Sequence, residues 1–124
     1  YYGDEAGMEG WEDPFNRACY PWGREDTELK AWFARLAHLR LDRPALQSGQ
    51  LHWCWTAGPI LAFARELNGQ LLTTVINAAD TPQSLTLPWS GAAPRDLLTG
   101  AVLSPADNVL PLTLLPHQGL LLES

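Results

Sequence analysis

Residues 59–77 read PILAFARELNGQLLTTVIN and hold two β-prone runs, Pro59–Glu66 and Leu71–Asn77, on either side of Asn68-Gly69. An Asn-Gly pair at this position favours a two-residue hairpin, because both turn residues take positive φ. Similar short runs precede and follow the pair, at Leu51–Thr56, Ser84–Trp89, Val109–Leu115 and Gly119–Glu123. Strands in series with no helix between them predict a mainly β fold, an antiparallel β-sandwich.

One α-helix is predicted ahead of the strands, over residues 27–41. Its apolar residues recur with helical period at Leu29, Trp32, Phe33, Leu36 and Leu39. Asp26 or Thr27 can cap its first turn, and Pro44 ends it because Arg43 is then biased away from helical angles. The apolar stripe, with Trp32 at a core position, needs a packing partner.

Residues 1–26 show no periodicity and are punctuated by glycine and proline, so they are predicted to form a loop. A loop of this length is uncommon inside a compact domain and is usually functional or belongs to a larger context.

The composition excludes several classes of protein. The chain has 124 residues, a net charge of −6 and only 8 Lys and Arg, which argues against nucleic-acid binding. No apolar run reaches the ~18 residues of a membrane span. Cys19 and Cys54 form no CxxC or Cys/His ligand spacing, so neither a metal nor a cofactor is expected. We favour two free, partly buried thiols. A disulfide between Cys19 and Cys54 is the alternative.

The N-terminal segment carries recognisable motifs. It reads YYGDEAGMEG over residues 1–10, then DPFNR over 13–17 and YPW over 20–22. These motifs resemble the α-amylase family of glycoside hydrolases, most closely its cyclomaltodextrinase, neopullulanase and maltogenic amylase branch. The resemblance covers essentially the whole chain. It implies that residues 1–46 are the end of a catalytic (β/α)8 barrel (strand-8 exit, loop and helix 8) and that residues 47–124 are the all-β C-terminal domain.

The resemblance implies that no catalytic residue lies in this chain, because the family takes its three catalytic carboxylates from earlier barrel strands. Physical reasoning agrees. A retaining glycosidase holds two carboxyl groups about 5–5.5 Å apart on a rigid scaffold. The acidic residues between Asp4 and Asp13 lie instead on a glycine-punctuated loop. The parent protein is therefore expected to be a glycosidase, and the isolated chain to be inactive.

By the family pattern, Asp13 and Arg17 are the substrate-binding candidates in the parent enzyme, where they would hydrogen-bond sugar hydroxyls. Their spacing also permits an ion pair within the loop. Trp11 and Trp22 are further candidates, for stacking on glucose rings, with loop packing as the alternative. Trp53 and Trp55 alternate with Cys54, so we expect them to share one sheet face, in the core or at an interdomain interface.

The favoured function is the non-catalytic C-terminal part of an enzyme acting on α-glucosidic bonds of starch-type oligosaccharides or cyclodextrins. The β-domain would stabilise the barrel, so the expected partners are the rest of the barrel and the α-glucan or cyclodextrin. A stand-alone carbohydrate-binding module, or a structural domain that self-associates through the exposed helix, is the alternative. No nucleic acid or membrane partner is expected. The chain begins without methionine, so further residues are expected before Tyr1, and a cytoplasmic location is expected.

Overall fold

The computed structural model describes all 124 residues, which form two compact units, Tyr1–Arg43 and Pro44–Ser124. The second unit opens with a short helix, α2 (Pro44–Ser48). The assignment of residues 1–46 to the end of a barrel stays a prediction. Ala45 in this helix is buried, and α2 packs on strands β2 (Ile60–Leu67) and β3 (Gln70–Asn77).

The first unit contains a short 3-10 helix, η1 (Asp4–Ala6), and the helix α1 (Thr27–Leu41). The predicted bounds of α1 are confirmed. The Asp26 side chain caps its first turn by accepting a hydrogen bond from the Leu29 N–H (2.9 Å). This contact satisfies one of the N–H groups that a helix start leaves without a partner.

The apolar stripe of α1 remains open to solvent. No residue of the helix is buried, and Trp32, Phe33 and Leu36 are exposed. The interpretation of Trp32 as a core residue is therefore wrong for this chain. A periodic stripe predicts that a helix has an apolar face, but it cannot say which segment covers that face.

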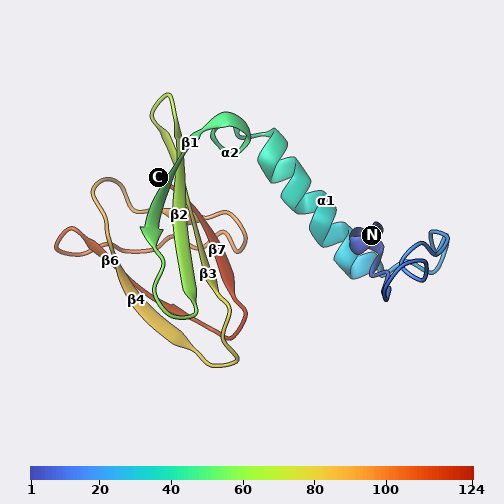
Figure 1. Ribbon diagram of the computed structural model, residues 1–124. Coiled ribbons are helices and arrows are strands. Elements are labelled where there is room, and N and C mark those ends of the chain that lie inside the picture. Colours follow the sequence, from blue (N-terminus) through green and yellow to red (C-terminus); the bar gives the residue numbers. More distant parts are fainter. The chain divides into compact units, whose positions relative to one another are not determined.

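The second unit is an antiparallel β-sandwich, which confirms the predicted fold class (Figure 1). The larger sheet has the order β1 (Gln50–Trp55), β2, β3, β7 (Gly119–Glu123) and β5 (Arg95–Asp96). The smaller sheet pairs β4 (Gln83–Pro88) with β6 (Val109–Leu114).

The hairpin of β2 and β3 forms as the Asn68-Gly69 pair predicts. The strands pair without interruption from Ile60 opposite Asn77 to Leu67 opposite Gln70. Asn68 and Gly69 take φ of 52° and 82°, as a two-residue turn that matches the strand twist requires.

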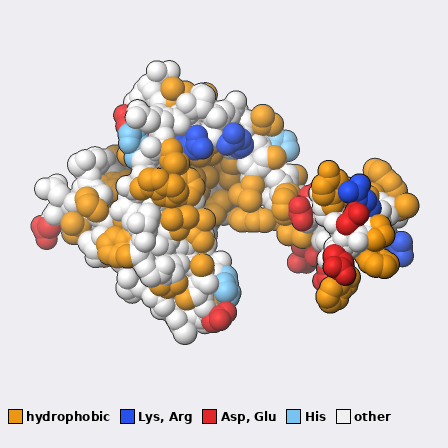
Figure 2. Space-filling model, viewed as in Figure 1, with side chains coloured by type: hydrophobic (Ala, Val, Ile, Leu, Met, Phe, Trp, Pro, Cys, Tyr) orange, Lys and Arg blue, Asp and Glu red, His pale blue; other side chains and the backbone are white.

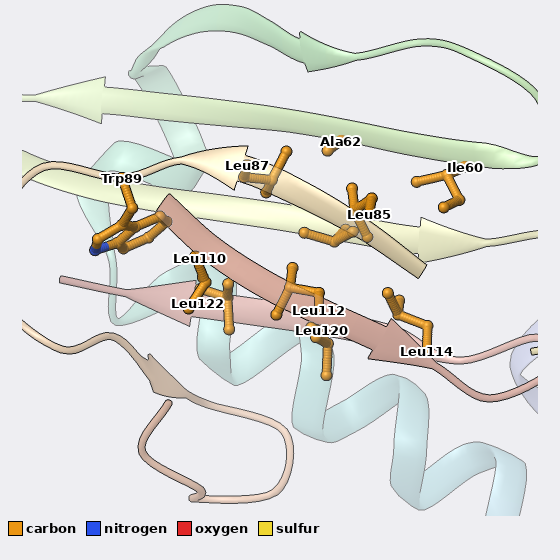
Figure 3. Packing of buried hydrophobic residues seen from close by; sticks show 11 residues of the cluster. Ile60, Ala62, Leu85, Leu87, Trp89, Leu110, Leu112, Leu114, Leu120 and Leu122 are labelled. Atoms are coloured by element: carbon orange, nitrogen blue, oxygen red, sulfur yellow. The ribbon is translucent and has the colours of Figure 1, made fainter. Parts of the chain in front are cut away.

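The core lies between the inner faces of the two sheets (Figure 3). Burial alternates along β2, so Ile60, Ala62 and Ala64 point inward while Leu61 and Phe63 point outward. Period-two alternation of this kind is what a strand with one buried face shows. Strand β3 adds Val75 to the cluster. The smaller sheet, the residue that follows β4 and strand β7 supply the other members, which are Leu85, Leu87, Trp89, Leu110, Leu112, Leu114, Leu120 and Leu122.

Strand β1 forms one edge of the larger sheet and corrects one prediction. Trp53 pairs with Phe63 but Trp55 pairs with Ala62, so the register shifts between them at a β-bulge. Phe63 and Ala62 point to opposite faces, and paired residues share a face. The expectation that Trp53 and Trp55 share one face is therefore wrong. Trp53 is 62% exposed and so lies outside the core of its unit.

Candidate functional site

The loop at residues 1–17 brings two of the predicted site residues together. The Arg17 Nε donates to the Asp13 Oδ1 over 2.6 Å, and both side chains are exposed. The Arg17 guanidinium also lies over the Tyr1 ring, 5.2 Å from its centroid. The ion pair that the spacing permitted is thus present, while the sugar contact stays a prediction. Only one carboxylate oxygen and Nε join the pair, which leaves hydrogen-bonding groups on both residues for neighbouring hydroxyls.

Local contacts hold this loop in shape. Gly3 and Gly7 flank η1 with φ of 84° and 71°, values that glycine adopts without steric cost. The Tyr2 hydroxyl donates to the Ala18 carbonyl over 2.9 Å, which ties the start of the chain to the residue after Arg17. The Asp26 N–H donates to the Ala6 carbonyl over 3.1 Å, which joins η1 to the start of α1.

The two tryptophans proposed for stacking are both exposed, Trp11 at 85% and Trp22 at 80%. The centroid of the Trp22 ring lies 4.6 Å from that of the Tyr20 ring, and the two rings are tilted by 51°. The Lys30 Nζ lies over the Tyr20 ring, 5.9 Å from its centroid. Hydrophobic, acidic and basic side chains lie intermixed on the visible surface of this unit (Figure 2). Stacking of either tryptophan on a sugar stays a prediction.

Two histidines have acidic partners in the structure. The His117 Nε2 lies 2.8 Å from the Asp80 Oδ1, and the His52 Nε2 lies 3.9 Å from the Glu66 Oε2. The partners are far apart in the chain, so only the strand pairing brings them together. Neither pair has a third member of the kind a metal site needs, and no group of three His, Cys, Asp or Glu side chains could hold a metal ion. None of the helices combines the length and apolar character needed to cross a membrane.

A cavity in the second unit was not predicted from the sequence. It measures about 330 Å³ and lies at one end of the sandwich, between the inner face of the larger sheet and the end of β4. Its lining includes Cys54, Ala64, Thr73, Leu87, Trp89 and Ser90. These residues come from four separate segments, so no local motif could have identified them.

Both cysteines are free thiols, as favoured from the sequence. The prediction that they are partly buried is wrong, because both residues are exposed to solvent. Cys54 nevertheless turns part of its side chain toward the cavity, and burial there raises the pKa of its thiol.

The architecture to be compared is an antiparallel β-sandwich that follows one amphipathic helix and a motif-bearing loop, and this class of all-β domain alone does not specify a function. A profile of the family described as Maltogenic Amylase, C-terminal domain, matches residues 56–121. The chain belongs to this family, and its resemblance to the cyclomaltodextrinase, neopullulanase and maltogenic amylase branch of the α-amylase family is confirmed.

Individual relatives agree with this assignment. An amylopullulanase of Thermoanaerobacter thermohydrosulfuricus is 34% identical over 87% of the chain, and Neopullulanase 2 of Thermoactinomyces vulgaris is 33% identical over 98% of it. The chain spans only 8% and 22% of the length of these two relatives. Among solved structures, an α-amylase of Anoxybacillus is similar to the chain with a TM-score of 0.90 and 26% identity. The match includes 99% of the present chain and 28% of the α-amylase.

Proposed function

We propose that this chain is the C-terminal part of an enzyme that acts on α-glucosidic bonds of starch-type oligosaccharides or cyclodextrins. In this proposal the chain itself is not catalytic, and its β-domain stabilises the catalytic barrel of the same protein. The observation that carries the proposal is the family match over residues 56–121 of a chain that spans a small part of its relatives.

The outer face of the larger sheet supports a stabilising role. Leu51, Trp53, Leu61 and Ile76 are large apolar residues that this face leaves exposed. The strand register places them together, because Trp53 pairs with Phe63 and Leu61 pairs with Ile76 on the face opposite the core. A contiguous apolar patch on a folded domain marks an interaction surface.

The loop of residues 1–17 supplies the proposed sugar contacts. In the enzyme, Asp13 and Arg17 would hold hydroxyl groups of a bound glucan with the hydrogen-bonding groups that their ion pair leaves over. Trp11 and Trp22, both exposed, would present indole faces to glucose rings.

The first test is the coding sequence upstream of Tyr1. The proposal expects an open reading frame that encodes further barrel strands with the catalytic carboxylates, and a longer protein that hydrolyses maltooligosaccharides or β-cyclodextrin. A stop codon directly upstream, or a longer protein with no activity on either substrate, would contradict it.

A second test separates barrel docking from the stability of the β-domain itself. Leu61→Glu places a charge on the proposed docking face, and Thr86→Glu places one on an exposed position of β4. We expect Leu61→Glu to lower the melting temperature of the longer protein but not of the 124-residue chain, because only the longer protein buries this position. Thr86→Glu should be neutral in both. Equal effects of Leu61→Glu in both proteins would rule out docking through this face.

A further inference from the structure

We propose that the cavity of the β-domain is a binding site for a single glucosyl unit, separate from the substrate contacts of Asp13 and Arg17. The inference rests on the proposed function for its choice of an α-glucan as the natural source of that unit. The volume of the cavity and the chemical character of its lining residues support this choice of ligand.

The size of the cavity suits a ring-sized ligand. At about 330 Å³ it falls at the lower end of the range of small-molecule sites in proteins. The space exists because Ala64 and Thr73, which pair with each other across β2 and β3, are too small to fill the gap beneath the end of β4. Elsewhere in the sandwich the space between the sheets is filled by leucines such as Leu112 and Leu120. Trp89 lies at one end of this cluster (Figure 3), and Leu87 and Trp89 both line the cavity.

The lining of the cavity carries a largely buried hydroxyl-bearing residue. Thr73 is only 3% exposed, and it lines the cavity. A threonine hydroxyl can both donate and accept a hydrogen bond, so a ligand hydroxyl that reaches this point can pair with it. A hydrogen bond formed away from bulk water is electrostatically stronger than one formed in water, which favours a ligand that carries hydroxyl groups.

The remaining lining selects the chemical class of the ligand. No Asp, Glu, Lys, Arg or His lines the cavity, so a charged ligand would be buried without a counter-charge. The hydroxyl-bearing Ser90 lies at the end of β4, and Leu87 and Trp89 provide apolar surface. A pyranose ring fits this combination, because it is neutral, carries hydroxyl groups at its edge and presents apolar C–H faces.

Cys54 lines the same cavity and can report on its occupancy. Burial raises the pKa of its thiol, so the thiolate that reacts with labelling reagents is scarce at neutral pH. In the 124-residue chain carrying Cys19→Ser, Cys54 is the one remaining thiol. Its rate of reaction with iodoacetamide at pH 8 then measures access to the cavity.

We expect maltose to slow this reaction in a saturable manner, with half-protection in the millimolar range, at concentrations up to about 100 mM. Thr73→Val keeps the shape of the side chain but removes the hydroxyl, and should weaken protection about 3- to 10-fold, the equivalent of one hydrogen bond. Thr73→Ser restores the hydroxyl and should restore protection. Thr74→Val, on the opposite face of the same strand, is the matched control and should leave protection unchanged. Circular dichroism checks that each variant is folded.

Three outcomes would overturn the site: no protection by maltose, equal effects of Thr73→Val and Thr74→Val, or stronger protection by 2-phenylethanol than by maltose, which would mark an apolar ligand. Failure of the proposed function would look different. It would appear as a longer protein that is inactive on glucans, a measurement that involves neither Cys54 nor Thr73.

Discussion

The buried Asp96 side chain stabilises the edge of the larger sheet through hydrogen bonds that no sequence pattern predicted. It is 1% exposed and sits in the two-residue strand β5. Its Oδ1 accepts from the N–H groups of Leu98 and Leu121, at 3.1 Å each, and its Oδ2 accepts from the N–H and hydroxyl of Thr99. The carboxylate therefore hydrogen-bonds both the turn at Leu98 and Thr99 and the neighbouring strand β7.

Replacing Asp96 by Ala should destabilise the β-domain by about 2–4 kcal/mol, because it leaves several buried N–H groups without an acceptor. For a domain of this size, this loss corresponds to a fall in melting temperature of about 10 °C or more. Thermal unfolding followed by circular dichroism measures it. Asp80→Ala, which removes an exposed partner of His117, is the control and should cost less than about 1 kcal/mol. Equal melting temperatures for the two variants would show that Asp96 is not such an anchor.

Arg17 tests the sugar contacts of the N-terminal loop. In the longer enzyme, Arg17→Ala should raise the KM for maltooligosaccharides more than it lowers kcat, since a residue that binds ground state and transition state alike contributes mainly to KM. Arg24→Ala is the control, because Arg24 is an exposed arginine that forms no ion pair. Steady-state kinetics on maltotriose makes the comparison. An unchanged KM in the Arg17 variant would leave the Asp13–Arg17 pair as a purely structural contact.

At the scale of the elements, local patterns predicted most of the fold. The helix α1 and six strands follow from periodicity, a cap and turn residues, all of which act within a few positions of the chain. What the sequence missed depends on distant parts of the chain. The strand β5 is two residues long and pairs with β7, and the bulge at Cys54 appears only in the register between β1 and β2.

The candidate sites divide in the same way. Asp13 and Arg17 lie four residues apart in a motif, so their proximity could be predicted from the sequence. The cavity is different, because Cys54, Thr73 and Trp89 come together only when strands from both sheets have packed. The small residues Ala64 and Thr73 look like ordinary strand positions until their neighbours across the sandwich are known.

The β2–β3 hairpin offers a test of turn chemistry. Gly69→Ala forces a side chain into a residue with φ of 82°, which should cost about 1–2 kcal/mol although nothing lies within 4 Å of the added Cβ. Gly119→Ala is the control, since its φ is not in the left-handed region and the added Cβ would meet only ordinary contact, with the Val75 carbonyl at 3.9 Å. Urea denaturation compares the two. A larger loss for Gly119→Ala would mean that turn conformation does not limit this hairpin.

At the scale of the whole molecule, the two units differ in how their apolar residues are used. All members of the hydrophobic cluster lie between Ile60 and Leu122, within the second unit. The helix α1 of the first unit buries none of its residues, and its stripe is left for a partner that we propose to be the remainder of the barrel. The family to which the chain belongs is defined by the second unit.

This difference predicts that residues 44–124 fold alone and residues 1–43 do not. Residues 44–124 contain the complete hydrophobic cluster and both sheets. The cooperative melting temperature of this segment should therefore lie within about 5 °C of that of the full chain, a shift of about 1 kcal/mol. Residues 1–43 rely on α1, and isolated helices of about 15 residues are marginal in water. The circular dichroism spectrum of this segment should therefore show little helix. A stable helical 1–43 peptide, or an unfolded 44–124 segment, would show that the first unit contributes to folding in a way that the burial of its side chains does not reveal.

The exposed residues Trp32, Phe33 and Leu36 of α1 also need a partner. Sedimentation of the full chain at rising concentration tests whether a second copy of the chain covers them.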